Sequence, residues 1–377
     1  MTELDALLIL NAIPGLGNMR IKKLIDFLGS AQKVFLLNDV QRREVVSNQI
    51  LPFEILENIQ KFPKDIYLKK EYNLVRSCGV FLMTSEDDLY PQRLKEIPDY
   101  PLVLYVKGDA AKLNLPAVAM VGSRKASVYG MLIAEKFAAQ LAESGVSIIS
   151  GLARGIDTCA HRGALKVKGI TVAVLGCGLG QVYPKENKKL ADEIVTAGAL
   201  ISEFPMATEP FYFNFPRRNR IVSGLSLGVV VVEASLKSGA LITSDFALEQ
   251  GREVFAIPGK VDQLNSQGTN RLIREGAKLV SCVEDILEEL KNPLQDYLKT
   301  PSKVRKKMKS PNCSNKDSDH LSQEEEKIYK HLTDLPRHVD DLTEQLEFPI
   351  TQLMVLLSKL EIKGRIKKLP GQLFIRV

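Results

Sequence analysis

Glycine, small hydroxyl and basic residues gather in short segments, several of which begin where an apolar run of the chain ends. The first three are Gly122–Gly130, Ser150–Asp157 and Gly176–Lys185. Glycines and hydroxyls at the start of a helix leave backbone N–H groups free, and these groups together with the helix dipole favour an anion. The charged members of the segments are mostly cations, which a phosphate backbone also requires. The segments therefore predict a groove that binds phosphates.

Three later segments have the same composition, namely Phe213–Gly224, Glu233–Thr243 and Gln267–Ile273. Region 116–290 as a whole is nearly neutral, with 19 basic and 18 acidic residues. Its cations are thus concentrated in these segments. A simpler interpretation assigns the glycines to turns and the arginines to surface ion pairs. For any single segment, this interpretation explains the sequence as well as a phosphate-binding groove does. For the six segments together, the phosphate-binding groove is the better explanation.

Two motif matches suggest other chemistry, and the neighbouring sequence argues against both. Gly176–Gly180 has the glycine spacing of a dinucleotide-binding loop, but Gln181 fills the final motif position and a Tyr-Pro pair blocks an immediate helix. Gly224–Gly228 matches a nucleophile elbow, a motif that must follow a strand, whereas this segment precedes an apolar run. Binding of NAD and serine hydrolase chemistry of this kind are therefore disfavoured.

A third match places Asp157 and His161 on one helix face, with Ser150 near in sequence. A hydrolytic arrangement of these residues is conceivable, but capping of the helix by Asp157 is the favoured interpretation. The sequence contains no P-loop motif, no C-x-x-C pair and no carboxylate cluster on these segments. We therefore predict no catalytic residue, no metal ligand and no cofactor, and we do not expect an enzyme.

The elements that must position these segments are short strands and helices in alternation. Apolar runs rich in Val and Ile predict strands buried on both faces, at Ala117–Val121, Val146–Ile149, Thr171–Leu175, Leu200–Ser202, Val229–Val232 and Val254–Ile257. Helical stretches lie between them, at Met131–Glu143, Thr158–Val167, Ala191–Ala197 and Ile242–Gln250. This alternation predicts an α/β domain with a parallel sheet and helices on both faces. Ligands bind such sheets at the carboxyl ends of the strands, where the segments lie.

Other regions flank the sheet domain, which we place at 76–290 with two short strands in its first part. Residues 1–75 have helical periodicity, and the turn Ile13–Gly17 is equally consistent with a phosphate-binding helix-hairpin-helix turn and with a simple tight turn. Residues 291–320 form a basic linker. Residues 321–377 predict three helices and a hairpin turning at Pro370-Gly371, the plan of a winged helix, which could contact DNA or a protein.

Composition and charge exclude several classes of protein. The net charge is +6, but the segment from Lys299 to Lys316 alone contributes +7, so the remainder carries −1 and the overall basicity is local. No apolar run is long enough for a membrane helix. The acidic start and the short apolar patch after it are unlike a secretory signal. Five cysteines predict reduced thiols. We expect a cytoplasmic protein without a membrane-bound form.

The ordered set of motifs resembles the bacterial DprA/Smf family, the DNA-processing proteins of natural transformation. The resemblance is specific over about residues 79–290 and weaker at both ends. It is carried by Val121–Arg124, Ser150–Asp157, Tyr183-Pro184, Ser202–Pro205, Phe215–Arg220, Ser238–Thr243 and Gln267–Asn270.

The resemblance implies an extended Rossmann-like domain that binds single-stranded DNA without catalysis. A helix-hairpin-helix or SAM-like domain precedes it and a winged-helix domain follows it. The family resemblance further implies a homodimer that protects single strands and helps to load the recombinase RecA. Arg124, Lys185, Arg218, Asn219 and Arg220 match positions that the family uses for DNA, and Arg217 fills a variable position. The full candidate set for single-stranded DNA is Gly122, Ser123, Arg124, Arg154, Gly155, Lys185, Arg217, Arg218, Asn219, Arg220, Ser238, Gly239, Thr243 and Asn270.

Four aromatic residues lie between Phe211 and Phe215, beside the arginine cluster. One of them could stack on a base, although packing in the core is the favoured interpretation.

Two other functions remain open. An enzyme acting on small nucleotides would need a catalytic loop that Lys237–Thr243 lacks. A transcription regulator would use residues 320–377 to read duplex DNA.

Overall fold

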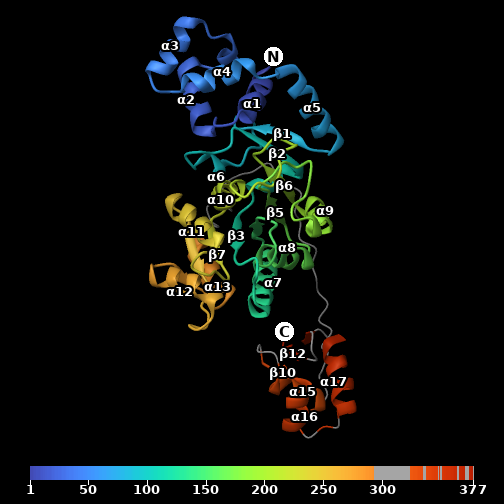
Figure 1. The fold of residues 1–377 in the computed structure, drawn as a ribbon. Coiled ribbons are helices and arrows are strands. Elements are labelled where there is room, and N and C mark those ends of the chain that lie inside the picture. The colour runs from blue at the N-terminus through green and yellow to red at the C-terminus, as the bar shows by residue number, and fades with distance from the viewer. Residues whose placement is uncertain are drawn as a thin grey trace. The chain divides into compact units, whose positions relative to one another are not determined.

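The computed structural model describes residues 1–292, 323–333, 337–346, 348, 350–362, 365–369 and 373–376 (Figure 1). The chain divides into two compact units, Met1–Ser302 and Lys303–Val377, which we describe separately. The predicted linker 291–320 lies outside the described residues except for its first two. The predicted helical and sheet domains fall together in the first unit, and the boundary between them at residue 75 stays a prediction.

Helices occupy the start of the chain, as predicted. They are α1 (Glu3–Ala12), α2 (Asn18–Leu28), the 3-10 helix η1 (Gln32–Leu36), α3 (Asp39–Ser47), α4 (Phe53–Lys61) and α5 (Lys64–Ser77). Thr2 and Asp5 form a capping box at the start of α1, and Gly29 ends α2 in the left-handed conformation. The helices gather beside the sheet edge that carries β1 and β2 (Figure 1).

A nine-stranded sheet forms the centre of the first unit, in the order β1-β2-β6-β5-β4-β3-β7-β8-β9. The strands from β6 to β9 in this order are parallel, and β2 and β1 extend one edge in antiparallel pairing. The bounds are β1 (Phe81–Thr84), β2 (Val103–Gly108), β3 (Ala117–Val121), β4 (Ser147–Ser150), β5 (Thr171–Val174), β6 (Ala199–Ser202), β7 (Gly228–Val231), β8 (Glu253–Ala256) and β9 (Lys278–Leu279).

Helices cover both faces of the sheet, and alternate residues of β3 show how. Val118 and Met120 pack in one core with α7 (Val128–Glu143), α8 (Ile156–Lys166) and α13 (Val283–Glu289). Ala119 and Val121 face the opposite core with α10 (Asn214–Gly224), α11 (Gly239–Glu249) and α12 (Gln267–Arg274). Nearly all residues of the central strands are buried, which confirms the predicted α/β sheet with two covered faces.

The remaining elements of the first unit are short, apart from α9. They are α6 (Gln92–Lys95), α9 (Lys188–Ala197) and the 3-10 helices η2 (Ala110–Asn114), η3 (Lys185–Asn187) and η4 (Leu264–Ser266). Every strand and helix that we predicted in region 116–290 is present, but α10, α12, α13 and β9 were not predicted. Helix α10 starts in an arginine-rich segment with Pro216 in its first turn, where the missing N–H costs no helical hydrogen bond.

The second unit has the predicted winged-helix plan. Its helices are α15 (Gln323–His331), α16 (Val339–Leu346) and α17 (Ile350–Ile362), and its strands β10 (Arg337–His338), β11 (Ile366–Leu369) and β12 (Leu373–Arg376) form the sheet β10-β12-β11. Leu342, Leu357 and Phe374 pack in its core. The predicted turn residues Pro370-Gly371 lie outside the described residues.

Within the described ranges, no helix is both long enough and apolar enough to span a bilayer.

Candidate nucleic-acid interface

A cleft of about 690 Å³ opens at the carboxyl ends of the central strands. The loops after β3, β4 and β7 and the starts of α10 and α11 line it. This is the edge at which parallel sheets bind ligands. The structure brings eight of the candidate residues to this cleft: Gly122, Ser123, Arg124, Arg218, Asn219, Ser238, Gly239 and Thr243.

Glu233 holds the loop after β3 in place. Its carboxylate accepts hydrogen bonds from the backbone N–H (2.8 Å) and the hydroxyl of Ser127, the residue that caps α7. Its carbonyl accepts from Ser123 N–H at 2.7 Å. Gly130 leaves room for the carboxylate, since a Cβ there would lie 2.4 Å from it. This role of Glu233 was not predicted from the sequence. The available signal was an acidic residue directly after the apolar run Val229–Val232, and the structure shows that residue to be buried.

The loop after β4 touches the loop after β3 at Gly155. This glycine has φ +74°, and a Cβ on it would lie 2.3 Å from the carbonyl oxygen of Ser123. Only glycine fits this conformation and this close approach. Candidate residues Ser238 and Asn219 shape the other wall of the cleft. The Ser238 hydroxyl accepts from Ala240 N–H at the start of α11, and the Asn219 amide donates to the Gly239 carbonyl at 3.3 Å.

Four of the candidate cations are exposed: Arg124, Arg154, Lys185 and Arg217. The Arg124 guanidinium lies 5.2 Å from the centre of the Phe215 ring and has no ion pair within the described part of the chain. Arg154 lines a smaller pocket next to the cleft and pairs with Glu186, whose hydrogen bond raises the pKa of Arg154. Arg124 is therefore the cation that is best placed to meet a phosphate in the cleft.

Arg218, a candidate for contact with DNA, is buried. It is 4% exposed, and its guanidinium donates to the carbonyls of Gly151 (2.7 Å) and Val174. Burial lowers the pKa of Arg218 to about 10, and the nearby Asp157 carboxylate opposes this shift. The side chain remains charged at neutral pH and fastens α10 to the ends of β4 and β5.

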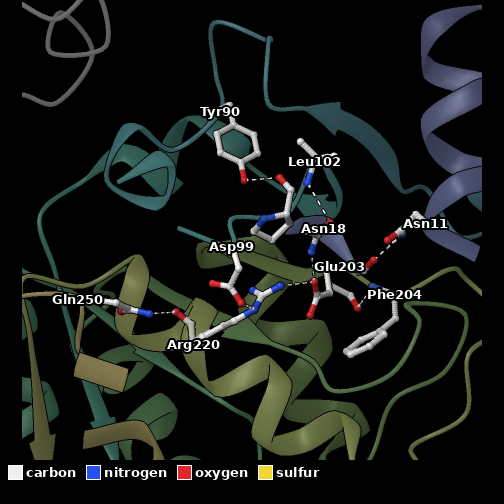
Figure 2. Close-up of polar contacts among 11 residues, drawn as sticks. Asn11, Asn18, Tyr90, Asp99, Leu102, Glu203, Phe204, Arg220 and Gln250 are labelled. Carbon is white, nitrogen blue, oxygen red and sulfur yellow. Dashed lines mark hydrogen bonds and ion pairs between the residues drawn. The ribbon is translucent and has the colours of Figure 1, made fainter. Parts of the chain in front are cut away.

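Arg220 points away from the cleft, also contrary to expectation. Its guanidinium pairs with Glu203 at 2.5 Å and with Asp99 at 2.7 Å, and only 5% of the residue is exposed (Figure 2). Asn270 is likewise outside the cleft, because its amide exchanges two hydrogen bonds with the backbone of Gly259. These internal partners give Arg220 and Asn270 structural roles.

The hydrolytic arrangement of Asp157, His161 and Ser150 does not form. Asp157 accepts from the N–H groups of Gly151 and Ala153 in the preceding loop, so the predicted helix cap is wrong as well. The His161 ring lies 2.7 Å from the Thr171 hydroxyl, and burial lowers its pKa to about 3. Ser150 donates to a backbone carbonyl. These contacts use Asp157, Ser150 and Nδ1 of His161 within the fold, and Nε2 of His161 has no partner among the described residues.

The aromatic residues are more exposed than core packing allows. Tyr212 is 85% exposed and lines the cleft, and Phe211 and Phe213 are about half exposed. Phe215 is partly buried and lies 5.6 Å from the ring of Tyr183. Core packing is therefore wrong for Phe211, Tyr212 and Phe213, and Tyr212 and Phe215 both line the cleft. Among the described residues no group of three His, Cys, Asp or Glu side chains could hold a metal ion.

The fold and the site define a class of protein: an extended doubly wound α/β domain with a cationic, aromatic cleft at its strand ends, followed by a winged helix. The family model for DNA recombination-mediator protein A matches residues 81–291, and that for the DprA winged helix domain matches residues 314–372. The chain belongs to the DprA/Smf family.

Several relatives are similar over most of the chain. Protein Smf of Escherichia coli is 42% identical over 77% of this chain and 76% of its own length. The DNA processing protein DprA of Streptococcus pneumoniae is 42% identical over 73% of this chain and 94% of its own. Its X-ray structure covers 77% of this chain and 98% of that chain, with a TM-score of 0.66 and 38% identity.

A structure of DNA processing protein A from Helicobacter pylori, described in terms of its single-stranded DNA binding mode, is similar as well. It covers 56% of this chain and 96% of that chain, with a TM-score of 0.51 and 31% identity.

Proposed function

We propose that this protein binds single-stranded DNA without sequence preference in the cleft at the strand ends. The observation that carries the proposal is the pairing of an exposed cation, Arg124, with the ring of Phe215 in a cleft that also holds the exposed ring of Tyr212. Cations follow the phosphate backbone and aromatic faces stack on bases, which is how single strands are bound without reading their sequence. The Helicobacter pylori relative, described as binding single-stranded DNA, supports this assignment.

The family membership extends the proposal to a role in DNA uptake. The bound strand is protected from nucleases and passed to the recombinase RecA, and the protein acts as a homodimer without catalysis. RecA loading is tested by recombinase ATP hydrolysis on DNA precoated with single-strand-binding protein. This protein should shorten the lag before hydrolysis, and an unchanged lag would contradict the loading role.

Binding is tested with fluorescence anisotropy of a labelled poly-dT strand over a salt series, with duplex DNA as competitor. We expect the logarithm of the binding constant to fall with the logarithm of salt concentration, with a slope of about −0.7 per phosphate contact. Duplex DNA should compete weakly, because its bases cannot reach the rings. Equal binding of duplex and single strand would contradict the cleft assignment and favour a duplex-reading regulator.

Replacement of Tyr212 or Phe215 by leucine should weaken single-strand binding while leaving the fold intact. Loss of a stacking face costs about 1–3 kcal/mol per base, which corresponds to roughly 5- to 150-fold in affinity. The measurement is anisotropy with poly-dT, together with a thermal melt to confirm folding. Val261→Leu is a matched control, since Val261 is 88% exposed and does not line the cleft. Wild-type affinity in both aromatic variants would refute stacking in the cleft.

A further inference from the structure

A second groove shares the aromatic segment 211–215 with the cleft, since Phe211 and Phe213 line the groove and Tyr212 and Phe215 line the cleft. Its volume is about 870 Å³, against about 690 Å³ for the cleft. One wall is the turn Ile13–Gly17 with the start of α2, and the other includes Phe211 and Phe213, which precede α10, and Arg217 within it. The sequence was equally consistent with a phosphate-binding turn and a simple tight turn at Ile13–Gly17. In the structure this turn lines a groove beside the cleft.

Buried polar contacts fix the two walls to each other (Figure 2). The Asn18 amide donates to the Glu203 carboxylate at 2.9 Å, and the Asn11 amide donates to the Glu203 carbonyl at 2.8 Å. Arg220 donates to the same carboxylate from α10. The groove is therefore formed before any ligand arrives, which lowers the entropy that binding costs.

The ion pair leaves one acceptor and one donor without a partner among the described residues. They are Oε1 of Glu203 and Nη1 of Arg220, and both side chains are more than nine-tenths buried and line the groove. Buried polar groups are rarely left unpaired. Because neither atom is open to solvent, this pair belongs to the framework of the groove and not to its binding face.

Two exposed rings give the groove its binding face. Phe211 and Phe213 are 47% and 51% exposed, and their rings stack on each other with centroids 5.4 Å apart and planes 7° apart. Parallel, half-exposed rings are a platform on which bases can continue the stack. Cations lie beside them, since Arg217 is exposed with its guanidinium 5.5 Å from the Phe204 ring, and Arg20 lines the opposite wall.

The rings also connect the groove to the cleft. Tyr212 lines the cleft and Phe213 lines the groove, and these two rings meet edge to face with centroids 5.5 Å apart. A strand that leaves the cleft over Tyr212 therefore meets the groove next.

We propose that the groove between the Ile13–Arg20 turn and α10 binds a second segment of the same single strand, with its bases stacked on Phe211 and Phe213. This inference rests on the proposed function of the cleft. It makes the N-terminal helical region part of the DNA site, and it makes affinity depend on strand length.

The first test uses the absence of tryptophan from the chain. In the full-length Phe213→Trp variant, tryptophan fluorescence should be quenched by a saturating poly-dT strand as a base stacks on the indole. Phe53→Trp is the matched control, because Phe53 is an exposed phenylalanine of the N-terminal helices that does not line the groove. Saturated binding without quenching in Phe213→Trp, or equal quenching in the control, would overturn the proposal.

The second test needs no new fluorophore in the protein. Labelled strands of about 6 and about 20 nucleotides, chosen from the usual range of single-strand site sizes, are titrated into the wild type and into the double variant Phe211→Leu/Phe213→Leu. Affinity for the long strand should fall by at least about 5-fold, the smallest loss expected when one stacked base loses its ring, and further if both rings hold a base. Affinity for the short strand should not change.

The outcomes separate the two proposals. Unchanged affinity for the long strand in the double variant refutes the groove while leaving the cleft intact. An equal loss for both strands refutes a separate groove site. Failure of the wild type to bind either strand refutes the cleft and the groove together.

Discussion

Arg124→Ala is expected to weaken the binding of single-stranded DNA by about 10- to 150-fold. A hydrogen bond to a charged group contributes about 1.5–3 kcal/mol, and Arg124 is the exposed cation that has no acidic partner in the described chain and lies against a ring of the cleft. Loss of one phosphate contact should also reduce the magnitude of the salt slope by about 0.7. Both quantities come from anisotropy titrations of poly-dT at several salt concentrations.

Two variants make this result specific. Arg162→Ala removes an exposed arginine of α8 that lines neither the cleft nor the groove, and it should leave affinity and slope close to those of the wild type. Arg124→Lys keeps the charge but loses the planar face above Phe215, so an intermediate affinity is expected. If Arg162→Ala and Arg124→Ala lose affinity equally, the effect is general charge and the cleft is not the site.

The second large effect is expected on stability, from Arg220→Met. Removing one member of a buried ion pair leaves its partner charged and uncompensated, which typically costs about 3–5 kcal/mol. Here Glu203 and Asp99 would both lose their cation, and Glu203 is 2% exposed. Urea unfolding of the full chain, followed by circular dichroism, measures the loss.

An exposed ion pair provides the control. Arg271 and Glu275 are about half exposed and one helical turn apart, so Arg271→Met should change stability by less than about 1 kcal/mol. In the double variant Glu203→Met/Arg220→Met the loss should be smaller than the sum of the two single losses, because the two residues interact. Wild-type stability with lost DNA affinity in Arg220→Met would reverse our assignment and return Arg220 to the DNA contacts implied by the family motif.

The strands could be predicted because burial on both faces of a parallel sheet selects continuous runs of Val, Ile and Ala, such as Ala117–Val121. The position of the candidate site followed from the same pattern, because the segments that follow parallel strands lie at the same edge of the sheet. Helix α10 could not be predicted in this way, because polar and charged residues share its buried face with Ile221 and Val222. Its buried positions include Arg218 and Arg220, whose partners come from distant parts of the chain.

The arginines on α10 show most clearly what could not be predicted from the sequence. Successive residues of a helix point about 100° apart, so adjacent arginines meet different surroundings. Arg217, at the variable motif position, is exposed, and Arg218 is buried beneath the cleft. The exposure of Phe211 and Tyr212 was also misjudged, because an aromatic cluster has the same sequence pattern in a core and on a binding face.

The hydrogen bonds from Asn11 and Asn18 to Glu203 affect how the first unit unfolds. The carboxylate of Glu203 accepts hydrogen bonds both from Asn18 in the N-terminal helices and from Arg220 in α10. Leu8, Ile9 and Leu24 also belong to the same apolar core as Leu175 and Leu200. Detachment of the helices would leave a buried charge with fewer partners and would expose that core. The helices and the sheet are therefore one cooperative unit. A chain from which residues 1–77 are removed would lose part of the free energy that keeps its sheet folded.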